Sequence, residues 1–354
     1  MDSKTYWRKR TDNKMRMGDK SIAILRSECE RLYKTSLRNI NKEIEAFYGR
    51  YAKMNDLTIA EVNKRLDPKE LKEAKEEIKN YYEMVNKLCK DNEGKISVEL
   101  LRRYKEKIRL QSARAYMSRL EGLKNSLEYQ LVNLGFREEI KFHDELSKLC
   151  RDVHSVTSFD VDKQMGFSTG FDEMSEQKIK FLVNERWLGE NYSDRIWKDK
   201  GKLLENINSI FLQGVARGQN PSVMAKEISR KYGTSFYNAE RLCITESAHI
   251  TESATMETYK EHGIDEIQFV ATLDERTCPD CGYWDGKHYL AKEAITGVNY
   301  PPVHPNCRCT TVAYFEPDEF SDESYRIARE GGTGKWYKVP ESMTYMEWKE
   351  TVGN

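Results

Sequence analysis

Four cysteines and one histidine gather in two short turns braced by proline. The first turn reads "TCPDC" and holds Cys278 and Cys281; the second reads "PPVHPNCRC" and holds His304, Cys307 and Cys309. Proline fixes one backbone angle and so restricts the chain around these side chains. If the thiols and the imidazole act together, the two turns must meet in space. That requirement constrains the fold of this part of the chain more than any other sequence feature.

The spacing of these residues is typical of a tetrahedral zinc site. Cys278-x2-Cys281 is followed after 22 residues by His304-x2-Cys307, and thiolates with imidazole suit zinc better than a harder ion. Cys309 points the same way as Cys307 in an extended chain, so it can replace His304 as the fourth ligand. We therefore expect a structural zinc held by four of these five residues, which would help to fold a small module with little core.

Two alternatives to zinc stay open at the level of sequence. The four thiols can pair as two disulfides, which requires an oxidising compartment, or they can be reduced and simply packed. A catalytic zinc is disfavoured, because the chain has no His-x-Glu before its Cys-x2-Cys and no His-Glu-x2-His. Asp274, Asp285 and His288 flank the cluster and are candidate acids or bases for a metal-dependent hydrolase or nuclease, with His304 as a fourth. Turn capping is the simpler interpretation of these residues.

The rest of the chain has the pattern of long, solvated helices. Charged residues make up 33% of the sequence and hydrophobic residues only 38%, and apolar positions recur every three to five residues. Asp67, Pro68 and Glu70 form a capping box with proline at the first helical position, and Asn220 and Pro221 begin another helix. We expect helices over about 21–51, 58–66, 68–90, 97–134, 176–218 with a break at 188–193 where Ser193 and Asp194 cap the second part, 221–232 ending at Gly233, and 235–262 ending at Gly263.

The fold class expected is mainly α, with a small C-terminal Cys/His-stapled module that contains β-strands, so α+β overall. Residues 156–175 lack a helical period and are expected to form a loop or hairpin, whereas "DEIQF" and "CRCTTVAYF" are strand-like. The expected domains are a long-helix region at 1–134, an α-rich body at 135–262, the Cys/His module at 263–315 and an acidic aromatic tail at 316–354. In that tail "GGTG" is a flexible link.

The charge distribution gives weak candidates for partner binding. Lys plus Arg equals Asp plus Glu at 58 each, but residues 1–40 hold eleven basic against five acidic side chains, and 95–124 hold nine against three. Such stretches can contact DNA phosphates or a protein partner, although solvated helix faces are the commoner meaning. The candidate residues are Arg8, Lys9, Arg10, Arg102, Arg103 and Arg114 for DNA or a protein partner, and Trp336 and Trp348 for docking.

Neither a signal peptide nor a membrane span is expected, because no apolar run approaches the length of about 20 residues that a bilayer requires. The other four cysteines are scattered through helical sequence and are expected to be small buried or half-buried hydrophobes. They are Cys29, Cys89, Cys150 and Cys243.

The segment "DERTCPDCGYWDGK…PPVHPNCRCTTV" resembles the signature of the Mu F-like phage head morphogenesis proteins, also called minor head or portal-associated proteins. The preceding "AERLCITESAHITESATMETYKEHGID" is similar to the helix that leads into that signature. Looser likeness to such proteins from tailed phages of Gram-positive bacteria extends over "NERWLGENYSDRIWKDKGKLLENINSIFLQGVARGQNPSVMAKEIS", "YWRKR" and "WYKVPESMTYMEWKE". One departure is that Cys243 and Ile244 stand where many relatives carry a basic residue before "TE".

The resemblance implies a virion protein without enzyme activity, present in few copies inside the head near the portal. Its implied partners are the portal protein, with coat or scaffold protein and packaged DNA as further candidates, and no membrane. Its implied roles are head morphogenesis, DNA packaging or ejection, carried out in the host cytoplasm during assembly and afterwards in the virion.

Overall fold

A computed structural model describes residues 3–52, 57–165, 173–315, 325–329, 336–340 and 343–352 of the chain. It divides into two compact units, each built from segments that are distant in the sequence. Unit 1 comprises Met1–Leu25, Glu145–Asn191 and Arg241–Asn354, and unit 2 comprises Arg26–Asp144 and Tyr192–Glu240. The division falls inside three long helices, and the four sequence domains remain a prediction.

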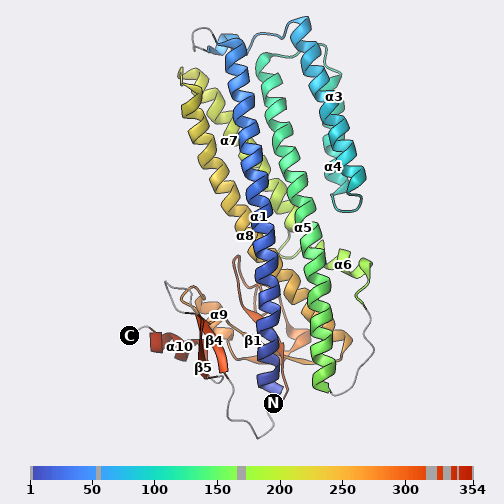
Figure 1. Cartoon of the computed structure of the whole chain (residues 1–354), viewed down its shortest axis with the longest axis vertical. Coiled ribbons are helices and arrows are strands. Elements are labelled where there is room, and N and C mark those ends of the chain that lie inside the picture. Colours follow the sequence, from blue (N-terminus) through green and yellow to red (C-terminus); the bar gives the residue numbers. More distant parts are fainter. Residues whose placement is uncertain are drawn as a thin grey trace. The chain divides into compact units, whose positions relative to one another are not determined.

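Ten α-helices and five strands are assigned within the described ranges, and Figure 1 labels most of them. The helices are α1 (Ser3–Tyr51), α2 (Ile59–Val62), α3 (Pro68–Asp91), α4 (Val98–Ser112), α5 (Arg119–Met165), α6 (Glu176–Val183), α7 (Tyr192–Ala216), α8 (Pro221–Glu261), α9 (Pro279–Trp284) and α10 (Tyr345–Val352). The strands are β1 (Glu266–Val270), β2 (His288–Leu290), β3 (Thr310–Ala313), β4 (Tyr325–Arg329) and β5 (Trp336–Pro340). The expected fold class, mainly α with a small β-containing module, is confirmed.

Unit 2 is helical and has its own apolar core. The helix α3 begins as the sequence predicts, since Asp67 accepts the backbone N–H groups of Lys69 and Glu70 and the Glu70 side chain accepts the N–H of Asp67. Helices α3 and α4 lie side by side (Figure 1). Their apolar faces pack on α5 around buried aromatic and aliphatic side chains. The core comprises Ile78, Tyr81, Val85, Cys89, Ile96, Ile108, Met117, Tyr129, Val132, Phe136 and Ile140.

The single helix expected over 97–134 is wrong, because the chain breaks between α4 and α5. Ser118 begins α5 with a reciprocal cap: its hydroxyl accepts the N–H of Glu121, and the Glu121 carboxylate accepts the N–H of Ser118 at 2.8 Å. The N–H of Leu66 bonds the carbonyl of Met117 at 2.9 Å and holds this break beside the loop before α3. The Ser-x2-Glu spacing of a capping box was the signal that marked the break.

The loop or hairpin expected over 156–175 is also wrong as far as Met165, because α5 continues through it; residues 166–172 lie outside the described residues. Several positions that α5 buries here are polar, including Thr157, Ser158 and Asp160. The buried positions have helical spacing, but polar residues occupy several of them, so the sequence shows no hydrophobic period there.

The helix α8 confirms one predicted boundary and corrects another. Asn220 accepts the N–H of Ser222 at 2.9 Å, and Pro221 is the first helical residue, as expected. Gly233 does not end a helix, because α8 runs through it as far as Glu261, and Gly263 then turns the chain at φ 69°. A single glycine costs a helix only about 1 kcal/mol, so the packing of neighbouring side chains overrides it.

The second helix of the 176–218 region, α7, starts one residue earlier than its predicted cap. Tyr192 is already helical, and Ser193 uses its hydroxyl to donate a hydrogen bond of 2.6 Å to Glu139 instead of capping. The helices α1 and α2 are present as expected, but α1 begins far earlier, at Ser3, and α2 ends at Val62, short of the expected residue 66.

Unit 1 contains an antiparallel sheet in the order β2-β1-β3. The strand β1 pairs with β3 from Ile267↔Ala313 to Val270↔Thr310, and with β2 from Glu266↔Leu290 to Gln268↔His288. The first and third strands are those that the sequence predicts, whereas β2 is too short to show a pattern. A separate hairpin joins β4 and β5. The predicted "GGTG" link at 331–334 lies outside the described residues.

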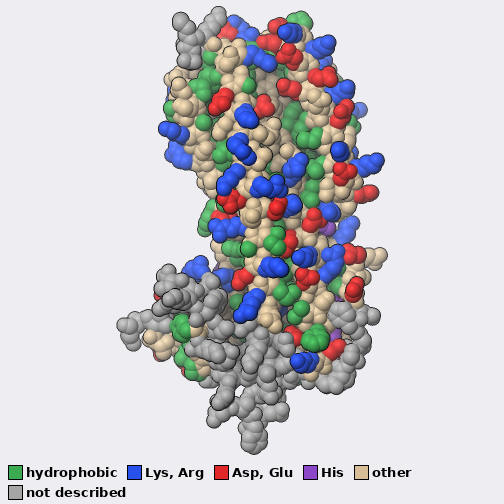
Figure 2. Space-filling view, in the orientation of Figure 1, with side chains coloured by type: hydrophobic (Ala, Val, Ile, Leu, Met, Phe, Trp, Pro, Cys, Tyr) green, Lys and Arg blue, Asp and Glu red, His purple; other side chains and the backbone are tan. Residues whose placement is uncertain are grey.

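Basic and acidic side chains alternate over the face of the helical region shown in Figure 2. Two of the three candidate arginines of the 95–124 stretch are paired with nearby acids: Arg102 with Glu99 at 3.4 Å and Arg114 with Glu121 at 3.0 Å. No described helix is both long and apolar enough to cross a bilayer.

Candidate metal centre

The first cysteine turn is the start of a short helix. Cys278 is the N-cap of α9, Pro279 is its first residue, and the Cys278 sulfur accepts the backbone N–H of Cys281 at 3.3 Å. The N–H of Gly282 closes the turn on the carbonyl of Cys278 at 3.0 Å. Because proline favours the first helical position and a polar atom favours the cap, the sequence "CPDC" places both sulfurs on one side of the turn.

The second turn orients the His304 side chain toward the first turn. The N–H of Cys307 bonds the carbonyl of His304 at 3.1 Å, and Asn306 adopts a left-handed conformation at φ 66°. His304 Nδ1 lies 2.8 Å from the carbonyl oxygen of Pro305. A carbonyl can only accept, so Nδ1 carries the proton and Nε2 of the neutral ring presents a lone pair.

The two turns meet, which confirms the central geometric expectation. Cys281 Sγ lies 3.4 Å from His304 Nε2 and 3.8 Å from Cys307 Sγ. Ligand atoms within 4.8 Å of one another form two groups that share Cys281: one with Cys278 and His304, the other with Cys307 and Cys309. All eight cysteines of the chain are free thiols in this structure. The donor set of soft sulfur and imidazole fits zinc.

Hydrogen bonds among the thiols shift the pKa values of Cys307 and Cys281 in opposite directions. Those from Cys281 and Cys309, with the backbone N–H groups of Cys309 and Val303, lower the pKa of Cys307 to about 2 although burial opposes this. The pKa of Cys281 is raised, chiefly because it donates to Cys307. The hydrogen bonds thus favour ionisation of Cys307 over that of Cys281, and a divalent cation would favour ionisation of its ligands further.

An ion pair next to the second turn holds its backbone in place. Arg308, between the two cysteines, makes a bidentate pair with Asp274, with one N···O distance of 2.7 Å. Although burial of Asp274 opposes ionisation, its bonds to Arg308 and to the N–H of Arg276 hold the pKa of this carboxyl below its usual range. The Thr272 hydroxyl donates to the carbonyl of Arg308 at 2.6 Å. These contacts fix the segment before β3 that carries Cys307 and Cys309.

The other predicted acid–base candidates are engaged in separate structural contacts. Asp285 accepts the backbone N–H of Ala271 at 2.8 Å and that of Tyr345 at 2.7 Å, so it anchors loops as the turn interpretation predicts. His288 is exposed, lies 3.2 Å from Glu266 and stacks on Tyr314. The described residues thus show Asp274, Asp285 and His288 in three different roles rather than in one reaction centre.

A buried clamp that sequence reasoning missed holds the module to the helices of unit 1. Glu252 of α8 is 1% exposed and accepts hydrogen bonds from the Thr310 hydroxyl at 2.5 Å and from the N–H and hydroxyl of Thr311 at 3.1 and 2.7 Å. Lys14 of α1 lies 3.2 Å from Glu252 and donates to the carbonyl of Thr311 at 3.0 Å. Burial lowers the pKa of Lys14, and Glu252 partly offsets this.

The near-repeat "ITESAHITESA" in α8 supplies side chains that bind other segments of unit 1. Thr245 accepts the N–H of Asn306 in the second cysteine turn at 3.1 Å, and Glu246 accepts the indole N–H of Trp187 at 3.2 Å. Thr245 and Glu252 thus join α8 to the second cysteine turn and to β3. Burial of Glu246 and Glu252 was not predictable from the sequence, because glutamate is seldom buried unless paired.

A cavity of about 90 Å³ lies beside this clamp within unit 1. Its wall includes Lys14 and Gly18 of α1, Thr251 of α8, and both Cys307 and Cys309. The second pair of cysteines therefore faces a hollow in the protein.

The remaining predicted site residues lie elsewhere. Trp348 is 1% exposed and packs with Tyr345, Leu273, Ala328 and Val339, so it is buried against this chain rather than presented at the surface. The side chains of Arg8, Lys9, Arg10 and Trp336 lie outside the described residues. Arg103 is exposed on α4.

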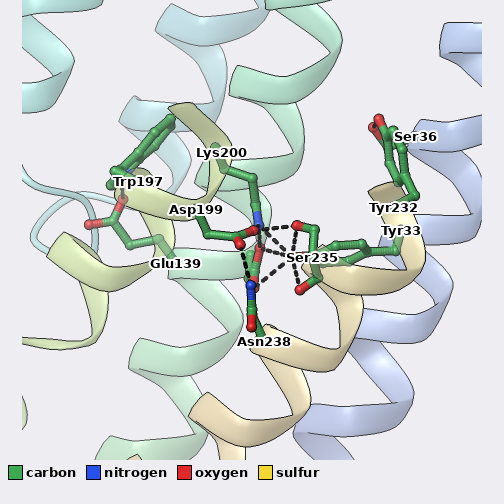
Figure 3. Close-up of polar contacts among 10 residues, drawn as sticks. Tyr33, Ser36, Glu139, Trp197, Asp199, Lys200, Tyr232, Ser235 and Asn238 are labelled. Atoms are coloured by element: carbon green, nitrogen blue, oxygen red, sulfur yellow. Dashed lines mark hydrogen bonds and ion pairs between the residues drawn. The ribbon is translucent and has the colours of Figure 1, made fainter. Parts of the chain in front are cut away.

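A second group of buried charges lies in unit 2. Lys200 of α7 is 2.9 Å from Glu138 of α5 and 3.2 Å from Asp199, and it donates to the Tyr33 hydroxyl of α1. Asp199 also accepts hydrogen bonds from the side chains of Ser235 and Asn238 of α8 (Figure 3). Burial alone would lower the pKa of Lys200, but the acids around it outweigh burial and raise it. A lysine surrounded by acids fits a structural network, not a nucleophile.

A known protein family matches the part of the chain that contains the cysteine cluster. Residues 205–312 match the family model described as "Phage Mu protein F like protein". A curated relative is the "NAD(+)--arginine ADP-ribosyltransferase EFV" of Enterococcus faecalis (strain ATCC 700802 / V583), 27% identical over 177 residues. The match covers 45% of this chain and spans only 36% of that relative's length. No solved structure matches the chain significantly. The resemblance to the Mu F-like phage head proteins is thus confirmed over residues 205–312, the segment that contains the whole cysteine–histidine cluster.

Proposed function

We propose that this protein is a minor head protein of a tailed phage, which binds the portal and assists head morphogenesis, DNA packaging or ejection from the interior of the head. The observation that carries the proposal is the family match over 205–312, with both cysteine turns inside it. Among the described residues, the chemistry-bearing side chains of that segment serve to hold the module together. A structural and binding role accounts for this arrangement.

The module supports the proposal by offering a metal a structural role. Cys278, Cys281, His304, Cys307 and Cys309 supply five donors from two turns, and zinc takes four. When bound, zinc would replace the hydrogen bonds among the thiols by stronger bonds and join the two turns. The chain's own contribution is to orient His304 through Pro305 and to hold Cys307 through the Asp274–Arg308 pair.

The test of this role is capture of the portal protein from the same virion by the full-length protein. We expect the wild-type chain to retain portal rings, and the double variant Cys281→Ser/Cys307→Ser to lose them together with bound metal. A folded wild-type protein that fails to retain portal would contradict portal binding. A double variant that folds, retains portal and enters heads normally would contradict the stapling role.

Because that double variant removes two ligands at once, Lys202→Ala serves as the control. Lys202 is exposed on α7, and its loss should leave folding, metal content and portal capture unchanged. The separate variant Arg102→Ala tests the weak prediction that Arg102 contacts the portal.

The ADP-ribosyltransferase activity printed in the name of the E. faecalis relative is not part of this proposal, because most of that protein lies outside the match. The alternative of a metal-dependent hydrolase or nuclease has no specific support, since Asp274, Asp285 and His288 are engaged in separate contacts. Robust cleavage of DNA or RNA by the purified protein with Mg²⁺ or Zn²⁺ would favour that alternative instead.

A further inference from the structure

The cluster offers five donors for four positions, and its geometry distinguishes them. We infer that Cys278, Cys281, His304 and Cys307 hold the metal, and that Cys309 stays outside the coordination sphere as a free thiol facing the cavity. This inference rests on the metal binding proposed above and specifies its ligands.

The orientation of His304 is the first argument. Its Nδ1–H is bound to the carbonyl of Pro305, and its Nε2 lies 3.4 Å from Cys281 Sγ. Metal-ligating histidines commonly donate their other ring N–H to a carbonyl or carboxylate, which fixes the ring and its tautomer. A histidine that only filled space would not require this arrangement. His304 therefore belongs to the ligand set, which leaves one cysteine in excess.

The distances from Cys281 are the second argument. With Zn–S bonds of about 2.3 Å and a Zn–N bond of about 2.0–2.1 Å, a tetrahedral site separates two sulfurs by about 3.8 Å and a sulfur from a nitrogen by about 3.5 Å. The structure has 3.8 Å between Cys281 Sγ and Cys307 Sγ, and 3.4 Å between Cys281 Sγ and His304 Nε2. Two edges of the tetrahedron are therefore already in place. Cys309 also lies within 4.8 Å of Cys281 and Cys307, so the orientation of His304, and not these distances, decides between His304 and Cys309.

The backbone around each sulfur is the third argument. Cys278-x2-Cys281 and His304-x2-Cys307 are each closed by one backbone hydrogen bond, so each turn presents a pair of ligands. The Cys307 sulfur accepts backbone N–H groups from both Val303 and Cys309, and such donors would stabilise a metal-bound sulfur. Cys309 lies beyond both turns, immediately before β3, and its sulfur accepts the N–H of Thr272.

The position of Cys309 also gives it a role outside the coordination sphere. It hydrogen-bonds with both Cys281 and Cys307, so its S–H can donate to a ligating thiolate. It also lines the cavity beside Lys14 and Thr251. Cys307 lines the same cavity, so a small thiol reagent there would reach both sulfurs. A ligated thiolate reacts slowly, so the free thiol would be labelled first. The other four cysteines, Cys29, Cys89, Cys150 and Cys243, are buried within helices.

The experiment compares the full-length protein with the variants Cys309→Ser and His304→Gln, each purified reduced and loaded with Zn²⁺ or Co²⁺. We expect Cys309→Ser to keep one metal per chain, with an unchanged thiolate-to-cobalt charge-transfer intensity, whereas His304→Gln weakens binding at least tenfold. In the zinc-loaded wild-type protein, iodoacetamide should label one thiol, identified as Cys309 by peptide mapping. Removal of the metal should raise the label to four.

The opposite pattern would overturn the assignment. If Cys309→Ser loses metal or charge-transfer intensity while His304→Gln keeps both, the ligands are four thiolates. Alkylation of Cys278, Cys281 or Cys307 in place of Cys309 in the loaded wild-type protein would also overturn the assignment, and this readout does not depend on how any variant folds. A wild-type protein that binds neither metal contradicts the proposed metal site itself, which distinguishes the two failures.

Discussion

At the scale of single residues, the two ends of the chain are joined through one carboxylate. Glu252 accepts from Lys14 and from both Thr310 and Thr311, so α1, α8 and β3 meet at a side chain that is almost fully buried. A buried charge is tolerated because every neighbour supplies a donor. The cysteine turns depend on this contact, because β3 begins directly after Cys309.

Replacing Glu252 by Ala should therefore lower the free energy of unfolding by about 3–5 kcal/mol, because Lys14 would remain buried without its partner. Urea denaturation followed by circular dichroism measures this. Glu205→Ala is the matched control on an exposed position of α7, where a change within about 0.5 kcal/mol is expected. Equal stabilities of the two variants would show that the clamp contributes little.

Gly282 is a second residue whose identity is fixed by packing. A Cβ atom at this position in α9 would lie 2.3 Å from Cδ1 of Tyr345, so the first turn of α10 fits only over glycine. The Tyr345 hydroxyl in turn donates to the carbonyl of Thr277 at 2.8 Å, next to Cys278.

Gly282→Ala should displace Tyr345 and destabilise the docking of α10 by about 1–3 kcal/mol. Trp348, which is buried beside Tyr345, should then become more solvent-exposed, and difference absorption or fluorescence quenching can follow it. Gly201→Ala in α7, where no atom lies within 4 Å of the added Cβ, is the control. An unchanged Trp348 environment in Gly282→Ala would contradict the packing argument.

At the scale of elements, unit 2 aligns four helices through a charged centre rather than by apolar contacts alone. Lys200 from α7 meets Glu138 from α5, Tyr33 from α1, and Asp199 with its partners on α8 (Figure 3). Polar networks of this kind are satisfied in only one arrangement of the helices. We expect the network to fix the register of the helices more than it adds to stability.

Lys200→Met should destabilise the protein by about 3–5 kcal/mol, because Glu138 and Asp199 would stay buried without a cation. Adding Glu138→Gln to that variant should recover part of the loss, a coupling that a double-mutant cycle of urea denaturation measures. Lys202→Met, on an exposed position two residues away, should change little. Strictly additive effects of the two core substitutions would argue against a coupled network.

The sequence predicts elements well where local chemistry and packing agree. Asp67, Pro68 and Asn220 mark helix starts that the structure confirms, because a cap acts within one turn. The convergence of the cysteine turns was predictable because only a shared centre explains their spacing. The continuation of α5 was not, since its buried face carries Thr157, Ser158 and Asp160, and neither was Glu252, whose donors lie 58 residues or more away.

At the scale of the whole molecule, the balance of charge limits what the chain binds by electrostatics alone. The net charge is zero, and basic and acidic side chains alternate across the face in Figure 2. Within the basic 95–124 stretch, Arg102, Lys107, Arg109 and Arg114 each lie within 4 Å of a glutamate. Such pairing leaves little positive potential for phosphates.

We therefore expect no gel shift of duplex DNA by the purified protein at an ionic strength of about 0.15 M, where screening acts over about 8 Å. A weak shift confined to low salt would fit a few phosphate contacts, whose affinity falls steeply with salt. A complex that persists at about 0.15 M would contradict this expectation. The variant Arg102→Ala/Arg103→Ala would then show whether α4 is responsible.

The contact between Lys14 and the carbonyl of Thr311 spans 297 positions of the chain. At synthesis rates of about 5–20 residues per second, the ribosome needs about 15–60 s to deliver that carbonyl after Lys14 has been made. During that interval Lys14 lacks this carbonyl, although Glu252 is made earlier. The contact between α1 and β3 therefore forms late in synthesis, only after residue 311 has been added.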